Sequence, residues 1–312
     1  MMTILGAGGP ISNELSVRLA AANLPYRLVG RNPSPRTGAT EVVAADLTKI
    51  DQTLKAIAGS DIVFLLAGLK YDRKIWAEQW PCIMGNTVEA CKRSGARLVF
   101  FDNVYMYGRV TGPMTEQTPY HPASRKGVIR SGIADSLIDE WKSRSLTAII
   151  ARAADFYGPG AEHGIPNTLV FDPLSKGKPA MCLAADNLPH SYTYTPDAAD
   201  ALVKLAQTDS AWNQTWHLPT TPNPPTGREF IEAAAQAMGV EPKYRILGSA
   251  VLGIAGLFKT EIREVREMLY QNNAPYLFDS SKYARAFGFA GTPYADGIRA
   301  TAASYKKLMA EG

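Results

Sequence analysis

The sequence predicts an α/β fold: a doubly wound parallel sheet followed by a smaller C-terminal lobe. Short apolar runs alternate through the first half with segments whose apolar residues recur at helical spacing. A glycine-rich turn joins the first run to the first such segment. Because parallel strands need crossover helices, and these cover the sheet on both faces, this alternation favours a parallel sheet.

Each predicted strand of the first half is short and apolar. Met2 to Leu5 forms the first strand, and Ile11 to Ala22 has the periodicity of an amphipathic helix. The later strands are Tyr26–Val29, Glu41–Ala44, Asp61–Leu66, Arg97–Phe101 and Leu146–Ala151. The helices between them are Leu54–Ala58, Trp76–Ser94 and Arg125–Ser145. Right-handed crossovers then wind the sheet in both directions.

The second half of the chain has a different character. Proline and glycine become frequent after Tyr157 and again after Pro219, and no internal repeat is present. We expect a dinucleotide-binding unit over residues 1–155 and a substrate-binding lobe over 156–312, partly interleaved with it. That lobe should lie over the carboxyl edge of the sheet, where ligands bind in such folds. Its predicted helices are Asp197–Gln207, Gly227–Met238, Thr260–Gln271 and Ala295–Met309.

Composition excludes several functional classes. With 46% hydrophobic and 20% charged residues, the 312-residue chain is typical of globular proteins. The net charge of +4 is spread along the chain, which argues against a nucleic-acid partner. The three cysteines and the N-terminus, which lacks a signal-like pattern, predict a reduced, cytoplasmic protein. The longest apolar stretch, Ile246 to Phe258, is too short to span a bilayer and is interpreted as a buried helix.

The glycine-rich turn predicts a phosphate site. Gly6 permits a tight turn after the strand, and Gly9 lets the backbone approach a pyrophosphate. The amides near Pro10 and Ile11 then point at it from the helix N-terminus. Ser12 takes the place of a third small residue. This context predicts a dinucleotide cofactor.

The ends of the next strands indicate which dinucleotide. An acidic residue after the second strand would bind the ribose 2′-hydroxyl of NAD, but Arg31 stands there and suits a 2′-phosphate. We therefore expect NADP, with NAD as the alternative. The remaining predicted cofactor contacts follow the third and fourth strands: Asp46, Leu47, Ala67 and Gly68.

The chain resembles the extended and atypical short-chain dehydrogenase/reductase group, the NAD-dependent epimerase/dehydratase enzymes. The matching segments are Gly6 to Ser12, Asn86, Val104 to Gly108, Arg152 to Gly160, Tyr194 to Ala199 and Thr226 to Gly239. The resemblance implies a nicotinamide cofactor that also contacts Ala154, and a small-molecule substrate with a homodimer possible. It also implies a pocket near Tyr157, His190 and Tyr192.

The chain departs from the group at its catalytic pair. The Tyr-x-x-x-Lys of the group falls on Lys126 and Arg130, and its Ser or Thr falls near Asp102 or Asn103. This is similar to the isoflavone-reductase and NmrA-like branch, where a lysine can serve as acid or base and some members sense dinucleotides without turnover. Lys126, Asn103 and Tyr105 are therefore the candidate catalytic residues.

Lys126 has two possible roles. Arg130, one turn further along the same helix face, would disfavour the protonated lysine and lower its pKa toward a useful value. Alternatively, Lys126 only binds the ribose hydroxyls of the nicotinamide. Tyr157 is interpreted mainly as a packing residue and His190 as a pocket or a surface histidine.

Two further patterns are interpreted as having no catalytic role. No histidine pairs with Asp, Glu or Cys at metal-ligand spacing, so we predict no metal. The alternating charges of Glu261, Arg263, Glu264, Arg266 and Glu267 are interpreted as a solvated helix face.

Two function classes remain open. One is an enzyme: an NADPH-linked reductase, or an epimerase or dehydratase, acting on a small and fairly apolar molecule. The other is a dinucleotide-sensing regulator without turnover.

Overall fold

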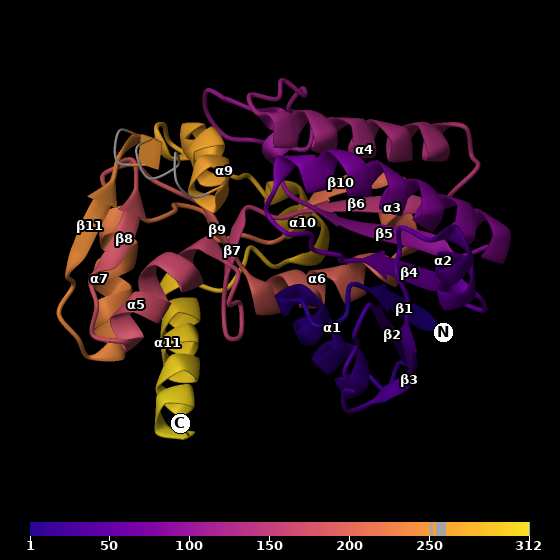
Figure 1. Ribbon diagram of the computed structural model, residues 1–312, viewed down its shortest axis with the longest axis horizontal. Coiled ribbons are helices and arrows are strands. Elements are labelled where there is room, and N and C mark those ends of the chain that lie inside the picture. Colours follow the sequence, from indigo (N-terminus) through magenta and orange to yellow (C-terminus); the bar gives the residue numbers. More distant parts are fainter. Residues whose placement is uncertain (250–251, 254–259, 312) are drawn as a thin grey trace.

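The structure is a computed structural model that describes residues 1–249, 252–253 and 260–311. Seven parallel strands form the central sheet, in the order β10-β6-β5-β4-β1-β2-β3 (Figure 1). Their bounds are β1 (Met2–Leu5), β2 (Tyr26–Gly30), β3 (Ala39–Ala44), β4 (Ile62–Leu65), β5 (Arg97–Asp102), β6 (Ala148–Arg152) and β10 (Gln214–His217). This confirms the predicted fold class.

Helices cover both faces of this sheet. One face carries α1 (Pro10–Ala21) and α6 (Thr195–Ala206), and the other carries α2 (Ile50–Ile57), α3 (Arg73–Ser94) and α4 (Arg125–Lys142). Ile4 packs toward α1 and α6, whereas its neighbour Leu5 packs toward α3 and α4. Successive strand residues point to opposite faces, so a sheet covered on both sides requires unbroken apolar runs.

The second half adds small sheets and several helices. β7 (Asp155–Tyr157) pairs with β9 (Tyr192–Tyr194), and β8 (Ala180–Leu183) pairs with β11 (Tyr244–Leu247). An aromatic core joins them to the surrounding helices. The helical elements here are η2 (Asn167–Phe171), α5 (Asp172–Ser175), α7 (Gly227–Met238), α9 (Thr260–Met268), η4 (Leu269–Asn272), α10 (Ser281–Phe287) and α11 (Tyr294–Glu311).

The boundary at residue 155 stays a prediction, and the structure adds how the two halves interleave. β10 comes from the second half yet forms the outermost strand beside β6. Helix α6 packs on α1, and α10 packs on β10. Residues 195–217 and 281–287 therefore lie with the first half in space, as Figure 1 also shows.

The structure bears on the buried helix expected in the apolar stretch from Ile246 to Phe258 and on the expected lack of a membrane span. The apolar stretch from Ile246 begins in β11, where Ile246 is exposed, and residues 250–251 and 254–259 lie outside the described residues. Within the described part, Ile246 and Leu247 end β11, whereas Ser249, Leu252 and Gly253 are helical and Leu252 is buried, so the stretch is part strand and part helix. Among the described residues, no helix is both long and apolar enough to cross a bilayer.

Candidate functional site

The glycine-rich turn lies where the strand order reverses, because β1 has β2 on one side and β4 on the other. Gly6 and Gly8 both have positive φ, +106° and +94°. A Cβ on Gly6 would lie 2.6 Å from the backbone of Ala67, so only glycine fits where the turn meets the end of β4. The predicted residues Gly6 and Ala67 are thus in contact, and Gly68 follows as an exposed residue.

The N-terminus of α1 is free of side-chain caps. Gly9 is the N-cap without a capping hydrogen bond, Pro10 is the first helical residue, and the first turn has no acidic residue. The Oγ of Ser12 is buried without a partner among the described residues. Backbone amides near Ile11, the helix dipole and this unpaired hydroxyl fit an anion such as a pyrophosphate.

Arg31 and Asp46 lie together at the ends of β2 and β3. Hydrogen bonds from Thr48 hold the pKa of Asp46 below its usual range, and the charges of Lys49 and Arg31 add to this effect. Arg31 is exposed. Leu47 is buried, and its carbonyl accepts a hydrogen bond of 2.9 Å from Asn86 Nδ2.

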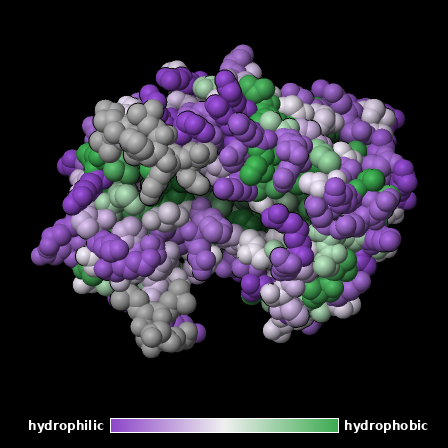
Figure 2. All heavy atoms as spheres, viewed as in Figure 1, coloured by the Kyte–Doolittle hydropathy of each residue, from purple (hydrophilic) through white to green (hydrophobic). Residues whose placement is uncertain are grey.

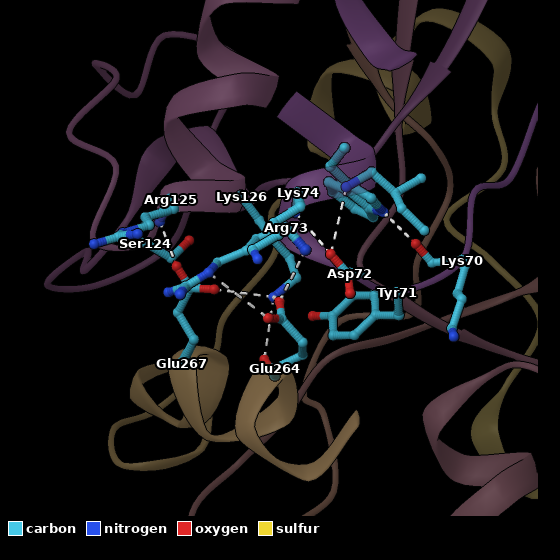
Figure 3. Close-up of polar contacts among 12 residues, drawn as sticks. Lys70, Tyr71, Asp72, Arg73, Lys74, Ser124, Arg125, Lys126, Glu264 and Glu267 are labelled. Atoms are coloured by element: carbon cyan, nitrogen blue, oxygen red, sulfur yellow. Dashed lines mark hydrogen bonds and ion pairs between the residues drawn. The ribbon is translucent and has the colours of Figure 1, made fainter. Parts of the chain in front are cut away.

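Lys126 is fully buried and held by α9 (Figure 3). Its Nζ forms ion pairs with Glu264 and with Glu267, the latter at 2.9 Å, and donates to the Glu264 carbonyl at 3.2 Å. It also lies 4.5 Å from the ring centre of Tyr71. A lysine ammonium has three donors, and these three acceptors use all of them. In this arrangement no donor of Lys126 is left for a ribose hydroxyl or a substrate.

Arg130 is not an unpaired cation beside Lys126, which corrects the expectation of a free second cation on this helix face. Its Nε donates to Asp102 Oδ1 at 2.8 Å, and its Nη2 contacts the same oxygen. Arg152 approaches the other oxygen of Asp102 at 3.4 Å. The buried carboxylate of Asp102 therefore pairs with Arg130 and is shared with Arg152.

Two phenols, Tyr71 and Tyr105, lie near Lys126. Their hydroxyl oxygens lie 3.4 Å apart. Burial, and then the charge of Asp155, raise the pKa of Tyr105; burial raises that of Tyr71 as well. Both phenols therefore stay protonated at neutral pH. Asn103 has another task, since its Oδ1 accepts from the Tyr105 amide at 3.0 Å and fixes the turn.

The predicted pocket residues separate into two groups. His190 and Tyr192 line a pocket in the second half, and His190 Nε2 lies 2.9 Å from Asp155 Oδ2. Tyr157 is 1% exposed and packs among Tyr192, Tyr194, Phe230 and Tyr294, which argues against substrate contact. Ala154 is buried, and its amide donates to Thr193 Oγ1 at 3.0 Å.

Sequence reasoning missed the residues that face this region from α9. The interpretation of the charged helix as wholly solvated is wrong for Glu264, which is 2% exposed, and for Glu267, which is partly buried. Their spacing of three residues, which places both on one helix face, was the available signal. Asp155 and Gly8 were also missed. Among the described residues, no three or more His, Cys, Asp or Glu side chains cluster as a metal site would require.

The space-filling view shows the surface where the first and second halves of the chain meet. Figure 2 shows apolar atoms in a hollow between the two parts of the molecule. α9 reaches across from the second half to the starts of α3 and α4, which lie at the carboxyl edge of the sheet.

Comparisons with known proteins agree with this architecture. A structure of MoeE5 in complex with UDP-glucose and NAD aligns over 99% of both chains, with a TM-score of 0.80 and 20% identity. The UDP-glucose 4-epimerase of Thermus thermophilus, in complex with NAD, aligns over 98% of this chain and 99% of its own, with a TM-score of 0.77 and 18% identity. At these identities the likeness shows the fold alone.

The relatives found by sequence similarity are longer than this chain. The chain is 25% identical to the Arabidopsis thaliana 3beta-hydroxysteroid-dehydrogenase/decarboxylase isoform 2, over 88% of this chain and 54% of that protein. The chain thus spans about half the length of this relative. The model of the NAD dependent epimerase/dehydratase family matches residues 2–217, more than half of the chain. The chain therefore belongs to the NAD-dependent epimerase/dehydratase family.

Proposed function

We propose that the protein is an NADPH-linked reductase of a small carbonyl compound. The observation that carries this is a contrast among three helices that start at the same sheet edge. α3 and α4 have side-chain caps from Asp72 and Ser124, whereas α1 has none and begins at the glycine turn. Of these three, the N-terminus of α1 is the one that remains for a pyrophosphate.

Arg31 supports NADP over NAD. It is exposed beside the predicted adenine-ribose position, where its guanidinium can pair with a 2′-phosphate. The structures of MoeE5 and of the Thermus epimerase contain NAD, so this preference is specific to the present sequence and stands as a proposal.

The proton donor we propose is Tyr105. A bound NADPH would supply a hydride to the carbonyl carbon of the substrate. Tyr105 would donate its phenolic proton to the carbonyl oxygen, which yields the alcohol and NADP⁺, and Tyr71, 3.4 Å away, is placed to pass a proton back. Lys126 is proposed as a positioning residue that holds α9 against α4.

The competing proposal is a dinucleotide sensor without turnover. It is favoured by the absence of a Tyr-x-x-x-Lys pair and by the fully occupied donors of Lys126. An epimerase or dehydratase remains a variant of the enzyme proposal, since it would use the same cofactor site.

Oxidation of NADPH in the presence of a panel of ketones and enones tests the reductase. We expect turnover that falls roughly 10²–10⁴-fold in Tyr105→Phe, as loss of a general acid predicts. Tyr305→Phe, on α11 and bonded to Asn167, is the matched control and should keep its rate. Tight NADPH binding with no oxidation of any compound would favour the sensor.

We also propose a homodimer. A groove between α3 and α4 is lined by apolar side chains that include Val128, whose exposed fraction is 58%. A second copy of the chain would bury this surface. Val128→Glu should then give a monomer in sedimentation velocity, whereas Val17→Glu, at an equally exposed valine on α1, should not. A cytoplasmic location stays a prediction from the cysteine count.

A further inference from the structure

The pocket beside His190 has mostly apolar walls. Its apolar side chains come from η2, β8 and α7 and include Leu169, Leu183 and Phe230. No lysine or arginine is among the described residues that line it. Arg228, next to the lining residue Gly227, is paired with Asp186 at 2.9 Å. A diphosphate requires cations or several backbone amides, so these walls do not suit a sugar nucleotide.

The charge behind the pocket points the same way. Asp155 lies at the start of β7, just beyond the carboxyl end of β6, and contacts His190 at 2.9 Å. Asp155 does not line the pocket, but a carboxylate directly behind the lining residue His190 disfavours an anionic ligand there, and the low-dielectric walls strengthen this effect.

The polar groups of the pocket can hold a neutral oxygen. The His190 ring is stacked on Tyr276, with ring centres 4.2 Å apart and an interplanar angle of 13°. Asp155 and Tyr276 therefore fix its orientation, and no described residue is bonded to its Nδ1. Asn272 lines the same pocket and offers an amide. A few polar groups within apolar walls, here the oriented His190 ring and Asn272, are typical of sites that bind uncharged molecules.

The pocket also lies near the phenols of the cofactor end. Asp155 is close enough to Tyr105 for its charge to be the second cause, after burial, of the raised pKa of that phenol.

We propose that this pocket selects an uncharged, largely apolar ketone or alcohol, with His190 binding an oxygen of that ligand. The proposal rests on the reductase function, which makes the ligand a ketone or its alcohol. It makes the substrate class different from the UDP-sugars in the structures of MoeE5 and related proteins.

Calorimetry on the NADP⁺-saturated protein tests the proposal without turnover. The probes are trans-2-decalone, a compact apolar ketone, and UDP-glucose. We expect decalone to bind and UDP-glucose to bind at least tenfold more weakly or not at all. Tighter binding of UDP-glucose than of decalone would overturn the proposal.

Three variants locate the binding site. His190→Ala should weaken decalone binding roughly tenfold through the lost hydrogen bond, and His121→Ala, at an exposed histidine, should not change it. Because His190 is buried and its replacement can unfold the protein, Leu169→Arg provides a second test at a partly exposed pocket wall. It should also weaken decalone binding at least tenfold.

The outcomes separate this proposal from the reductase function. Unchanged decalone affinity in folded His190→Ala, or in Leu169→Arg if the first variant does not fold, would show that the ligand lies elsewhere and overturn the proposal. Decalone bound at His190, together with no oxidation of NADPH by any compound of the panel, would refute the reductase function and support the pocket assignment.

Discussion

Arg31 is the residue on which the choice between NADP and NAD depends. Arg31→Ala should weaken NADPH binding about 10–100-fold, because a charge-assisted contact of about 1.5–3 kcal/mol to the 2′-phosphate is lost. Binding of NADH should not change. Titration calorimetry with both cofactors measures this, and Arg36→Ala at another exposed arginine of the same loop is the control. Equal loss for both cofactors would place Arg31 away from the ribose.

Substitutions at Gly9 and at Gly6 should have opposite effects, although both residues belong to the turn. A Cβ on Gly9 meets only the Gly6 carbonyl oxygen at 3.6 Å, an ordinary contact, so Gly9→Val should keep the melting temperature. It should abolish NADPH binding, because the side chain would fill the space of the pyrophosphate. Gly6→Ala should instead lower the melting temperature, since its Cβ would lie 2.6 Å from Ala67. Normal cofactor affinity in Gly9→Val would refute this placement of the loop.

The sequence predicted the residues of the glycine-rich turn better than it predicted the contacts of the candidate catalytic residues. Gly6 and Gly9 are recognisable because local backbone geometry requires them within a few residues of a strand. Lys126 was predicted to lie near the nicotinamide from its place on α4, but its partners Glu264 and Glu267 come from more than 130 residues further along the chain. No local pattern around Lys126 shows which carboxylates it meets, so its occupied donors could not be foreseen.

Helix α9 is held to the first half by two carboxylates. Glu264 accepts from the Arg73 amide at the start of α3 at 3.1 Å, and Glu267 accepts from the Arg125 amide at the start of α4. Each carboxylate thus caps a helix N-terminus and also pairs with Lys126 (Figure 3). Negative charge at these positions is favoured by both helix dipoles. Electrostatics therefore add to the apolar packing of Ile262 and Val265 in holding α9 over the sheet edge.

The Lys126–Glu264 pair should be strongly coupled. Lys126→Met removes the ammonium from the buried Glu264 and the partly buried Glu267 and should lower the free energy of unfolding by about 3–5 kcal/mol. The double variant Lys126→Met/Glu264→Gln should cost less than the sum of the single variants, because the buried charge is then removed with its partner. Urea unfolding of the four proteins measures the coupling.

A partly exposed ion pair provides the control for the double-mutant cycle of Lys126 and Glu264. Lys92 and Glu140 are 3.1 Å apart and partly exposed, so Lys92→Met should cost less than about 1 kcal/mol. Additive effects for Lys126→Met and Glu264→Gln would mean that the contact contributes little to docking α9.

The strands of the two halves differed in how well the sequence predicted them. β1, β4, β5 and β6 are buried on both faces, so each is mainly apolar. The exceptions are Thr3 in β1 and the strand-end residues Arg97, Asp102 and Arg152. β7 and β9 have three residues each and contain tyrosines and polar residues, which gives no periodicity to detect. Their pairing depends on contacts about 37 residues apart along the chain, such as Asp155 with Tyr192.

At the scale of the whole molecule, a buried polar network joins the sheet to the second half. His217 in β10 hydrogen-bonds the Tyr107 hydroxyl at 2.8 Å through Nε2 and the Asp279 carbonyl at 2.8 Å through Nδ1. The carbonyl can only accept, so Nδ1 carries the proton and Nε2 accepts from Tyr107. Arg152 in turn donates to the Tyr107 oxygen at 2.7 Å. This directional chain requires a neutral imidazole.

That requirement predicts how global stability depends on pH. Burial, and then the charge of Arg152, lower the pKa of His217 from 6.5 to about 3. Below pH 6.5 the unfolded chain binds a proton that the folded chain does not, so the stability present above 6.5 is lost as the pH falls. This group alone should lower the free energy of unfolding by about 1.4 kcal/mol per pH unit between pH 6.5 and roughly 3.

His217→Gln isolates the effect. The variant lacks the titrating ring, so its free energy of unfolding, lower at pH 7.5, should fall less steeply on acidification than that of the wild type. Urea unfolding at four pH values from 7.5 to 4.5 gives both slopes, and their difference should approach one proton below pH 6. His121→Gln, at an exposed histidine, should keep the wild-type slope. Parallel curves for His217→Gln and the wild type would mean that His217 can accept a proton without unfolding, and that the network linking β10 to η1 (Tyr105–Tyr107) tolerates the charge.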